Sequence, residues 1–201
     1  MERVQGRRIG SDDPSAVTIA HQPDVQRMLL SMKSQTEAAR ALTCFVAASI
    51  DISKRHEDES VRRRYDRLVG LLTPVVKARA TDIGIEAADT GIQVHGGMGY
   101  IEESGAPQHL RDARITSIYE GTNGIQANDL IGRKVARDKG ETAAEFIAMM
   151  RELDADLGAA SGEHISVIRS QLRTALDDLA DATSWLVETF PAQPRLPAAG
   201  A

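Results

Sequence analysis

The stretch RDARITSIYEGTN, residues 111–123, joins two segments of helical periodicity and gathers charged, aromatic and glycine residues in a short span. Glu120 follows an apolar approach and precedes Gly121, a residue type that lets the backbone come close to a ligand. Thr122 or Asn123 can cap the helix that follows. A carboxylate between apolar neighbours and a helix N-terminus is a candidate general base. We therefore expect the function to depend on Glu120.

Apolar residues on both sides of this stretch recur at three- and four-residue steps, as in amphipathic helices. The predicted helices span residues 23–53, 60–73, 75–95, 107–118 and 123–136. Pro74 predicts a kink or a new start, because proline cannot donate the interior hydrogen bond. Residues 1–20 are polar and are predicted to form a loop, and strand content should be near zero. The predicted fold is an all-α, up-down helical bundle.

Residues 140–190 carry two further apolar stripes separated by a turn rich in Gly, Ser and Ala. This pattern predicts an antiparallel helical hairpin that must bury its stripes on something. Trp185 is expected in a core or an interface rather than at a cofactor. The chain end is rich in Pro and Ala and has little apolar content to pack. The predicted domains are a helical bundle at 1–136, a hairpin extension at 137–190 and a disordered tail at 191–201.

The 201 residues are 42% apolar and 26% charged, as in an ordinary globular protein. A net charge of -5 and an aromatic content of 3% argue against a general nucleic-acid binder. Cys44 is the single cysteine, so no disulfide can form within the chain, and we expect a buried, reduced thiol. No apolar run approaches membrane-spanning length, and the basic start lacks the apolar core of a signal peptide. These features predict a soluble, cytoplasmic protein.

Several kinds of site lack their sequence motifs. Glu-x-x-His pairs for a di-iron bundle are missing, and one cysteine with scattered histidines offers no zinc site, so we expect no metal. The chain has neither a Walker loop nor a Rossmann glycine fingerprint after a strand, and it lacks Gly-x-Ser-x-Gly.

Motifs in a fixed order carry a resemblance to a known family. QVHGGMGY at residues 93–100 is followed by RDARI at 111–115 and YEGT at 119–122. This order and spacing resemble the C-terminal domain of FAD-dependent acyl-CoA dehydrogenases. LLTP at 71–74 and the periodic last third look like the large bacterial branch with a C-terminal extension, which includes 3-methylmercaptopropionyl-CoA dehydrogenases.

The resemblance implies a flavoprotein that oxidises acyl-CoA thioesters to 2,3-enoyl-CoA. Glu120 would remove the α-proton, FAD would accept the hydride, and Tyr119 and Gly121 would lie along the substrate. The implied FAD-binding residues are Arg3, Gln5, Gln93, Gly96, Gly97 and Thr122. Electron-transfer flavoprotein would be the electron acceptor, and the protein would form a homo-oligomer, a dimer or a tetramer.

The residues alone leave plainer explanations open. The glycines of the motif at residues 93–100 could simply end the preceding helix, because glycine readily adopts a left-handed backbone conformation. The stretch Glu2-Arg3-Val4-Gln5-Gly6 could be a frayed terminus. The charges at residues 111–114 could simply form a solvated or salt-bridged face, and His95 by itself is more often structural than a ligand. Gly124 stands where many family members have a glutamine, so that contact is not carried over.

The family places a helical domain and a β domain before this bundle, and nothing in this sequence could supply those strands. We therefore expect either a fragment or a gene product that needs a partner carrying the missing domains, and in both cases a chain that is inactive alone. The alternative is a helical assembly module without activity of its own.

Overall fold

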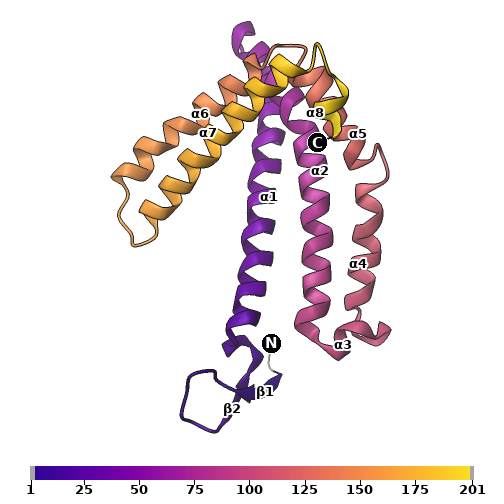
Figure 1. The fold of residues 1–201 in the computed structure, drawn as a ribbon, viewed down its shortest axis with the longest axis vertical. Helices are drawn as coiled ribbons and strands as arrows, with labels where there is room; N and C mark the ends of the chain where they lie inside the picture. Colours follow the sequence, from indigo (N-terminus) through magenta and orange to yellow (C-terminus); the bar gives the residue numbers. More distant parts are fainter. Residues whose placement is uncertain (1–2, 200–201) are drawn as a thin grey trace. The chain divides into compact units, whose positions relative to one another are not determined.

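The computed structural model describes residues 3–199, and helices predominate in it, which confirms the all-α prediction (Figure 1). The motif residue Glu2 and the last two residues of the predicted tail lie outside this range. The chain divides into two compact units. The first contains the described residues up to Cys44 together with Ala78–Glu120, and the second contains Phe45–Lys77 and the described residues from Gly121 onward.

Two long helices pass from one unit into the other: α1 (Pro23–Arg55) and α2 (Glu59–His95). α2 runs through Pro74 without ending, so the new start predicted there is wrong, and the alternative, a kink, stays a prediction. Proline inside a helix costs about 3 kcal/mol. The side chains of Leu68, Leu71 and Leu72 are buried beside it, and full burial of each such side chain stabilises by about 1.5–3 kcal/mol. Packing therefore outweighs the lost hydrogen bond.

The start of the first unit is a two-stranded antiparallel ribbon rather than the predicted loop. β1 (Val4–Arg7) pairs with β2 (Ala16–Thr18), with Val4 opposite Thr18 and an irregular register. The strands are too short to show alternation in sequence. They are held from outside, because the Gln22 side-chain amide donates hydrogen bonds to the carbonyls of Gln5 at 3.3 Å and Arg7 at 3.1 Å.

The core of the first unit joins α1 to the end of α2. Its buried members are Ile19, which lies in the short helix η1 (Ile19–His21), Val25 and Val94. Three half-buried residues of α1 pack against them: Met28, Leu29 and Met32.

The prediction that Cys44 is buried is wrong, and the helical periodicity of α1 explains why. Cys44 is exposed, because the buried Val46 and Ser49 lie on the other face of α1.

After α2 the chain of the first unit turns and returns along it (Figure 1). The returning elements are α3 (Gly97–Tyr100), η2 (Glu102–Ser104), α4 (Ala106–Arg114) and η3 (Ile115–Ser117). The helix predicted over 107–118 is thus present, with a tighter last turn.

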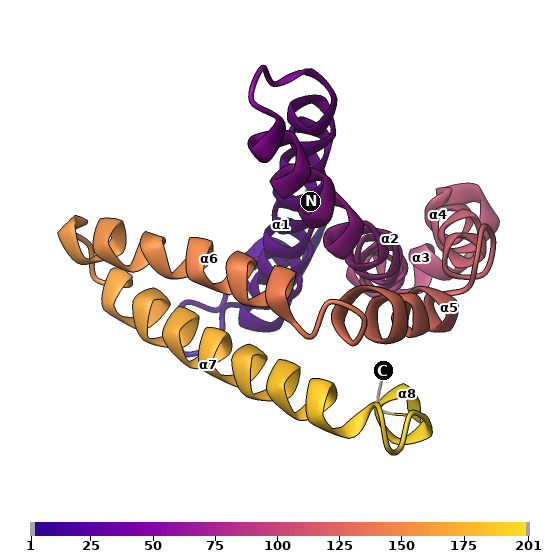
Figure 2. The ribbon, with the colours of Figure 1, turned by 90° about the horizontal axis from the view of Figure 1, so that it is seen from above.

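The second unit begins its C-terminal part with α5 (Asn123–Asn128) and the π-helical turn η4 (Asp129–Val135), where a single helix was predicted. α6 (Glu141–Ala159) and α7 (Ile165–Thr189) then run antiparallel side by side, as predicted for the hairpin (Figures 1 and 2). A short helix, α8 (Arg195–Ala199), lies within the predicted tail, and its Pro197 is buried. Buried Leu71, Val135 and Ala143 form the core of this unit.

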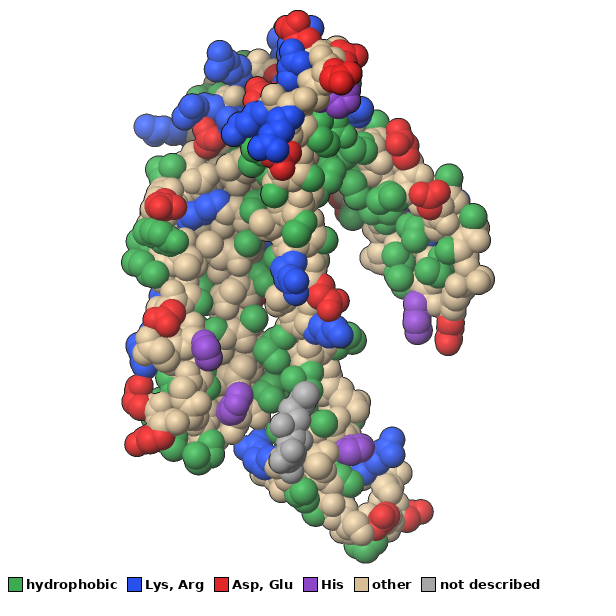
Figure 3. Space-filling view, turned by 180° about the vertical axis from the view of Figure 1, so that it is seen from behind, with side chains coloured by type: hydrophobic (Ala, Val, Ile, Leu, Met, Phe, Trp, Pro, Cys, Tyr) green, Lys and Arg blue, Asp and Glu red, His purple; other side chains and the backbone are tan. Residues whose placement is uncertain are grey.

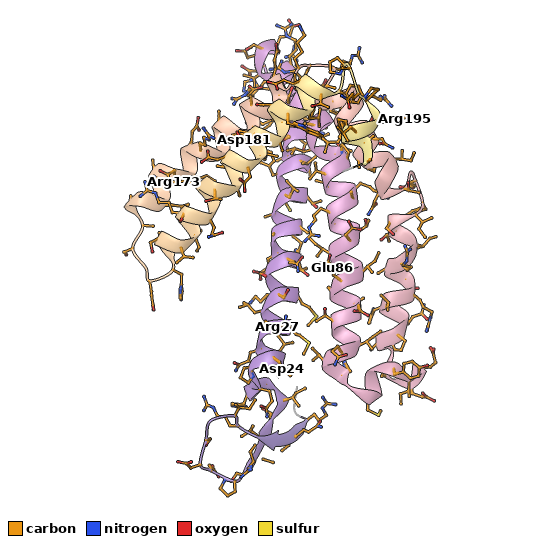
Figure 4. All side chains as sticks on the ribbon, viewed as in Figure 1. Asp24, Arg27, Glu86, Arg173, Asp181 and Arg195 are labelled. Carbon is orange, nitrogen blue, oxygen red and sulfur yellow. The ribbon has the colours of Figure 1, made fainter. Side chains whose placement is uncertain are left out.

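Two kinds of contact build the hairpin. Asp138 accepts hydrogen bonds from the backbone N–H groups of Gly140 and Thr142, both at 3.0 Å, and so caps the start of α6. Near the tip, the Asp154 carboxylate on α6 receives paired hydrogen bonds from Arg169 and Arg173 on α7 at 2.6–2.8 Å. Figure 4 labels Arg173 in this part of the hairpin.

Hydrophobic side chains are visible on the face of the hairpin that Figure 3 shows. Trp185, on α7, is 48% exposed, so it is not a core residue, and its expected interface role remains a prediction. No helix among residues 3–199 is long and apolar enough to cross a membrane.

Candidate active site

The candidate base lies in a strained turn. Glu120 has a φ of 53°, a left-handed conformation that residues with a side chain rarely adopt. For such residues this conformation costs about 1–2 kcal/mol. Tyr119, before it, is 49% exposed, and Glu120 itself is exposed. Strained residues of this kind concentrate at functional sites.

Gly121 follows with a φ of 87°, a conformation that favours glycine. A Cβ at this position would lie 3.1 Å from Nε2 of Gln126. The backbone conformation therefore requires glycine here, whereas the flexible end of Gln126 could move by the few tenths of an ångström that a Cβ would need. Gln126, which packs on this glycine, is a residue that the sequence analysis missed.

The helix after this turn begins as predicted. Thr122 is the N-cap of α5, and its Oγ1 accepts a hydrogen bond from the Ile125 N–H at 3.2 Å. The next residue, Asn123, is held from α2, because the Lys77 ammonium donates a hydrogen bond to its Oδ1 at 2.9 Å. The hydroxyl of Thr122 is thus engaged in capping, and its predicted role at a cofactor remains a prediction.

The glycine turn at the end of α2 brings two predicted cofactor-binding residues together. Arg3 donates hydrogen bonds to the carbonyls of His95 at 3.0 Å and Val94 at 3.3 Å. Its guanidinium also lies across Gly96, whose φ is 63°. A cation at this end of a helix satisfies open carbonyls and complements the dipole. In this chain Arg3 therefore closes α2.

Gln93 and Gly97 remain open to a ligand. Gln93 is exposed on the last turn of α2, and Gly97 is exposed with nothing within 4 Å of the place a Cβ would occupy. Gly99, a residue not singled out from the sequence, is the most constrained glycine of the turn. A Cβ there would lie 2.2 Å from the Ile92 carbonyl oxygen. Its place as the third glycine of the motif at residues 93–100 was the feature of the sequence that could have identified it.

Gln5 lies on β1 and is exposed, and its backbone carbonyl is used in holding the ribbon. The described contacts do not join it to Gly96 or Gly97. Gln5, like the glycine turn, belongs to the first unit, and Thr122 belongs to the second.

One of the charges before the turn, Arg111, is ion-paired, whereas Asp112 and Arg114 form hydrogen bonds with Gln108 and Ser117. Both nitrogens Nη1 and Nη2 of Arg111 donate to the Glu102 carboxylate, at 2.9 and 2.6 Å. Hydrogen bonding to Glu102 raises the pKa of the Arg111 guanidinium. Glu102 and Glu103 are both exposed. The Glu102 carboxylate thus forms an ion pair, whereas a general base has a carboxylate that is free to accept a proton.

Comparisons with known proteins identify the family. The family described as "Acyl-CoA dehydrogenase, C-terminal domain" matches residues 8–135. The chain is 43% identical over 176 residues to a 3-methylmercaptopropionyl-CoA dehydrogenase of Ruegeria pomeroyi, covering 87% of this chain and 30% of the relative. It is 35% identical over 181 residues to the broad-specificity linear acyl-CoA dehydrogenase FadE5 of Mycobacterium tuberculosis, covering 88% of this chain and 29% of that protein.

Among solved structures, one described as "Bd2924 apo-form" matches with a TM-score of 0.58 and 24% identity. The match covers 89% of this chain and 36% of that one, and it shows the fold alone. The chain thus spans less than a third of the length of the two relatives above. Since the family match covers more than half of its residues, the chain belongs to the acyl-CoA dehydrogenase C-terminal domain family.

Proposed function

We propose that this chain is the C-terminal helical part of an FAD-dependent acyl-CoA dehydrogenase, with Glu120 as the base. The observation that carries the proposal is the strained, exposed Glu120 between Tyr119 and a required glycine. Family membership and identity to two acyl-CoA dehydrogenases support it.

In the proposed reaction the Glu120 carboxylate takes the proton from the α-carbon of an acyl-CoA thioester. The backbone N–H of Glu120 donates to the thioester oxygen as negative charge develops there, in the manner of an oxyanion hole. FAD, when bound, would supply the hydride acceptor for the β-carbon. The electron pair left at the α-carbon would form the double bond as the β-hydrogen leaves with its electrons, so the acyl group would become a 2,3-enoyl-CoA and Glu120 would carry the α-proton. Electron-transfer flavoprotein would reoxidise the flavin.

The residues toward the cofactor fit this role unevenly. The exposed side-chain amide of Gln93 and the open backbone of Gly97 suit the polar adenosine and phosphate groups of a dinucleotide. Gly96 and Thr122 would contribute through backbone and hydroxyl groups. Two N–H groups of Arg3 donate hydrogen bonds to carbonyls of α2. Arg3, together with Gln5, would therefore approach the cofactor only from the edge of the β1–β2 ribbon.

A second candidate function is an inactive helical assembly module. The exposed hydrophobic face of the hairpin favours it, because such faces commonly mark interfaces. A visible absorption spectrum of the purified protein separates the two candidates. A bound flavin supports the enzyme, whereas a colourless oligomer supports the module.

The direct test uses the full-length protein that carries this chain, with FAD bound. Glu120→Gln keeps the shape and the hydrogen-bonding groups but removes the basic site. Flavin should still bind, while anaerobic reduction by acyl-CoA should slow by about 10² to 10⁴-fold or more, the usual contribution of a general base. Straight-chain acyl-CoA thioesters of several lengths and 3-methylmercaptopropionyl-CoA serve as substrates. Glu103→Gln is the matched control, and the assignment fails if the control rather than Glu120→Gln blocks reduction.

A further inference from the structure

The turn that carries Glu120 is anchored to α2 by one charged side chain. We propose that Lys77 is a positioning residue for Glu120: by holding Asn123, it fixes the start of α5 and the backbone just before it. This inference rests on the proposed function of Glu120. It assigns a role in the chemistry to a residue that never has to touch the substrate.

The contact is short, charged and shielded. Lys77 Nζ lies 2.9 Å from Asn123 Oδ1 in a partly buried site, and the two residues are 46 positions apart in the sequence. A hydrogen bond from an ionised donor is roughly twice as strong as a neutral one. Lys77 belongs to α2, a helix of 37 residues. A long helix is a rigid support for the short loop that Lys77 contacts.

The chain between Asn123 and Glu120 has little freedom to absorb a movement. Thr122 is bonded to the Ile125 N–H through its side chain, and Asn123 is held by Lys77. Two of the three residues that follow Glu120 therefore have a restraint of their own. A shift of Asn123 would pass along this row to the residue before it, which is Glu120.

Glu120 needs this external support. Its side chain is exposed and its φ of 53° is unfavourable, so its own burial cannot hold the conformation. Strained residues persist only where the surrounding structure fixes them. The restraints at Thr122 and Asn123 meet that need, and the one at Asn123 comes from Lys77, which lies far away in the sequence.

A purely structural role for Lys77 makes a different prediction. A helix-packing lysine would change the melting temperature and leave the chemistry of each folded molecule as it was. A positioning residue changes the rate of proton removal in molecules that still bind flavin and acyl-CoA. Misplacement of a reacting group by about 1 Å can cost on the order of 10²-fold in rate.

The test uses the full-length, FAD-loaded protein and the acyl-CoA that reduces the parent fastest. Lys77→Met and Asn123→Ala should each slow anaerobic flavin reduction by about 10 to 100-fold with little change in acyl-CoA binding. The isotope effect measured with α-deuterated substrate should rise, since proton removal becomes the slow step. Lys77→Arg keeps a cationic donor and should recover most of the rate. The double variant should lose less rate than the product of the two single losses, because the two residues share a contact.

Asn128→Ala is the matched control, since Asn128 is an exposed asparagine at the end of the same helix α5. It should reduce flavin at the parent rate. If Lys77→Met loses its flavin or its fold, Asn123→Ala decides the question, and a parental rate and isotope effect in that variant overturn the inference. Glu120→Gln, run in parallel, separates the two proposals. Reduction at the parental rate in Glu120→Gln removes the proposed function and this inference with it, whereas a block there with normal Asn123→Ala removes only the inference.

Discussion

Arg3 and Gly96 lie against each other at the carboxyl end of α2, so close that a Cβ on residue 96 would be 2.6 Å from Arg3 Nη1. The first described residue of the chain thus closes a helix that ends more than ninety residues later. The guanidinium donates to the carbonyls of Val94 and His95, which have no partner within the helix. Glycine at position 96 is therefore explained by local packing before any cofactor is considered.

Arg3→Met tests this relationship. The substitution keeps a long side chain but removes both hydrogen bonds, so the free energy of unfolding should fall by about 1 kcal/mol. Thermal unfolding measures the change. Arg7→Met is the control, because Arg7 is also exposed on β1 and its side chain makes no hydrogen bond or ion pair within the described residues. Equal melting temperatures for Arg3→Met and the parent would show that the contact contributes nothing.

Gly99 and Gly84 should respond to alanine with opposite signs. At Gly99 the new Cβ would lie 2.2 Å from the Ile92 carbonyl oxygen, and backbone must move to make room. We expect a loss of about 1–3 kcal/mol, as for other overpacked sites. At Gly84, inside α2, nothing lies within 4 Å of the new Cβ, so alanine should stabilise by up to about 1 kcal/mol through helix propensity. Chemical denaturation of both variants measures the two signs, and a tolerated Gly99→Ala would contradict the geometry of the turn.

The fold was predictable wherever a long periodic segment decided it. The stripes beginning at Val25 and at Ile165 gave α1 and α7, and the glycines after His95 marked the end of α2. The new helix start predicted at Pro74 was wrong, because the burial of neighbouring leucines outweighs the cost of a proline inside a helix. Predictions from local sequence alone do not include this burial. The ribbon at residues 4–18 was not predicted for a related reason, because it is held by Gln22, which lies outside the two strands.

The candidate site was predictable in composition but not in geometry. The motif order singled out Glu120, Gly121 and Thr122, and capping chemistry placed Thr122 at the start of α5. The positive φ of Glu120 could not be read from a glutamate. The contact between Lys77 and Asn123 was equally hidden, because it depends on how α2 lies beside α5 within the second unit.

The hairpin should weaken in acid through Asp154. Hydrogen bonds from Arg169 and then Arg173 hold the pKa of the Asp154 carboxyl well below its usual range. Because the folded pKa is the lower one, the stabilisation is complete above the unfolded value of about 4 and is lost as the pH falls below it. Asp154→Asn should therefore flatten the decline in melting temperature below about pH 4. Asp178→Asn, at an exposed carboxylate without an ion pair among the described residues, should leave the decline unchanged, and identical acid profiles for both variants would remove Asp154 from the explanation.

Replacing Glu120 by glycine should stabilise the protein while abolishing the proposed chemistry. Glu120 is held at a φ of 53°, and glycine adopts this region without the steric cost of a side chain, which is about 1–2 kcal/mol. Part of that gain is lost to the greater freedom of glycine in the unfolded chain, so we expect a net increase of up to about 1 kcal/mol. Lys139, at a φ of 57°, is the matched position with the same backbone strain outside the candidate site. Lys139→Gly should stabilise by a similar amount and leave flavin reduction unchanged. Glu120→Gln keeps the strain and should melt close to the parent. If Glu120→Gly melted below Glu120→Gln while Lys139→Gly melted above the parent, the turn at Glu120 would not be strained, and its conformation could no longer support a functional assignment.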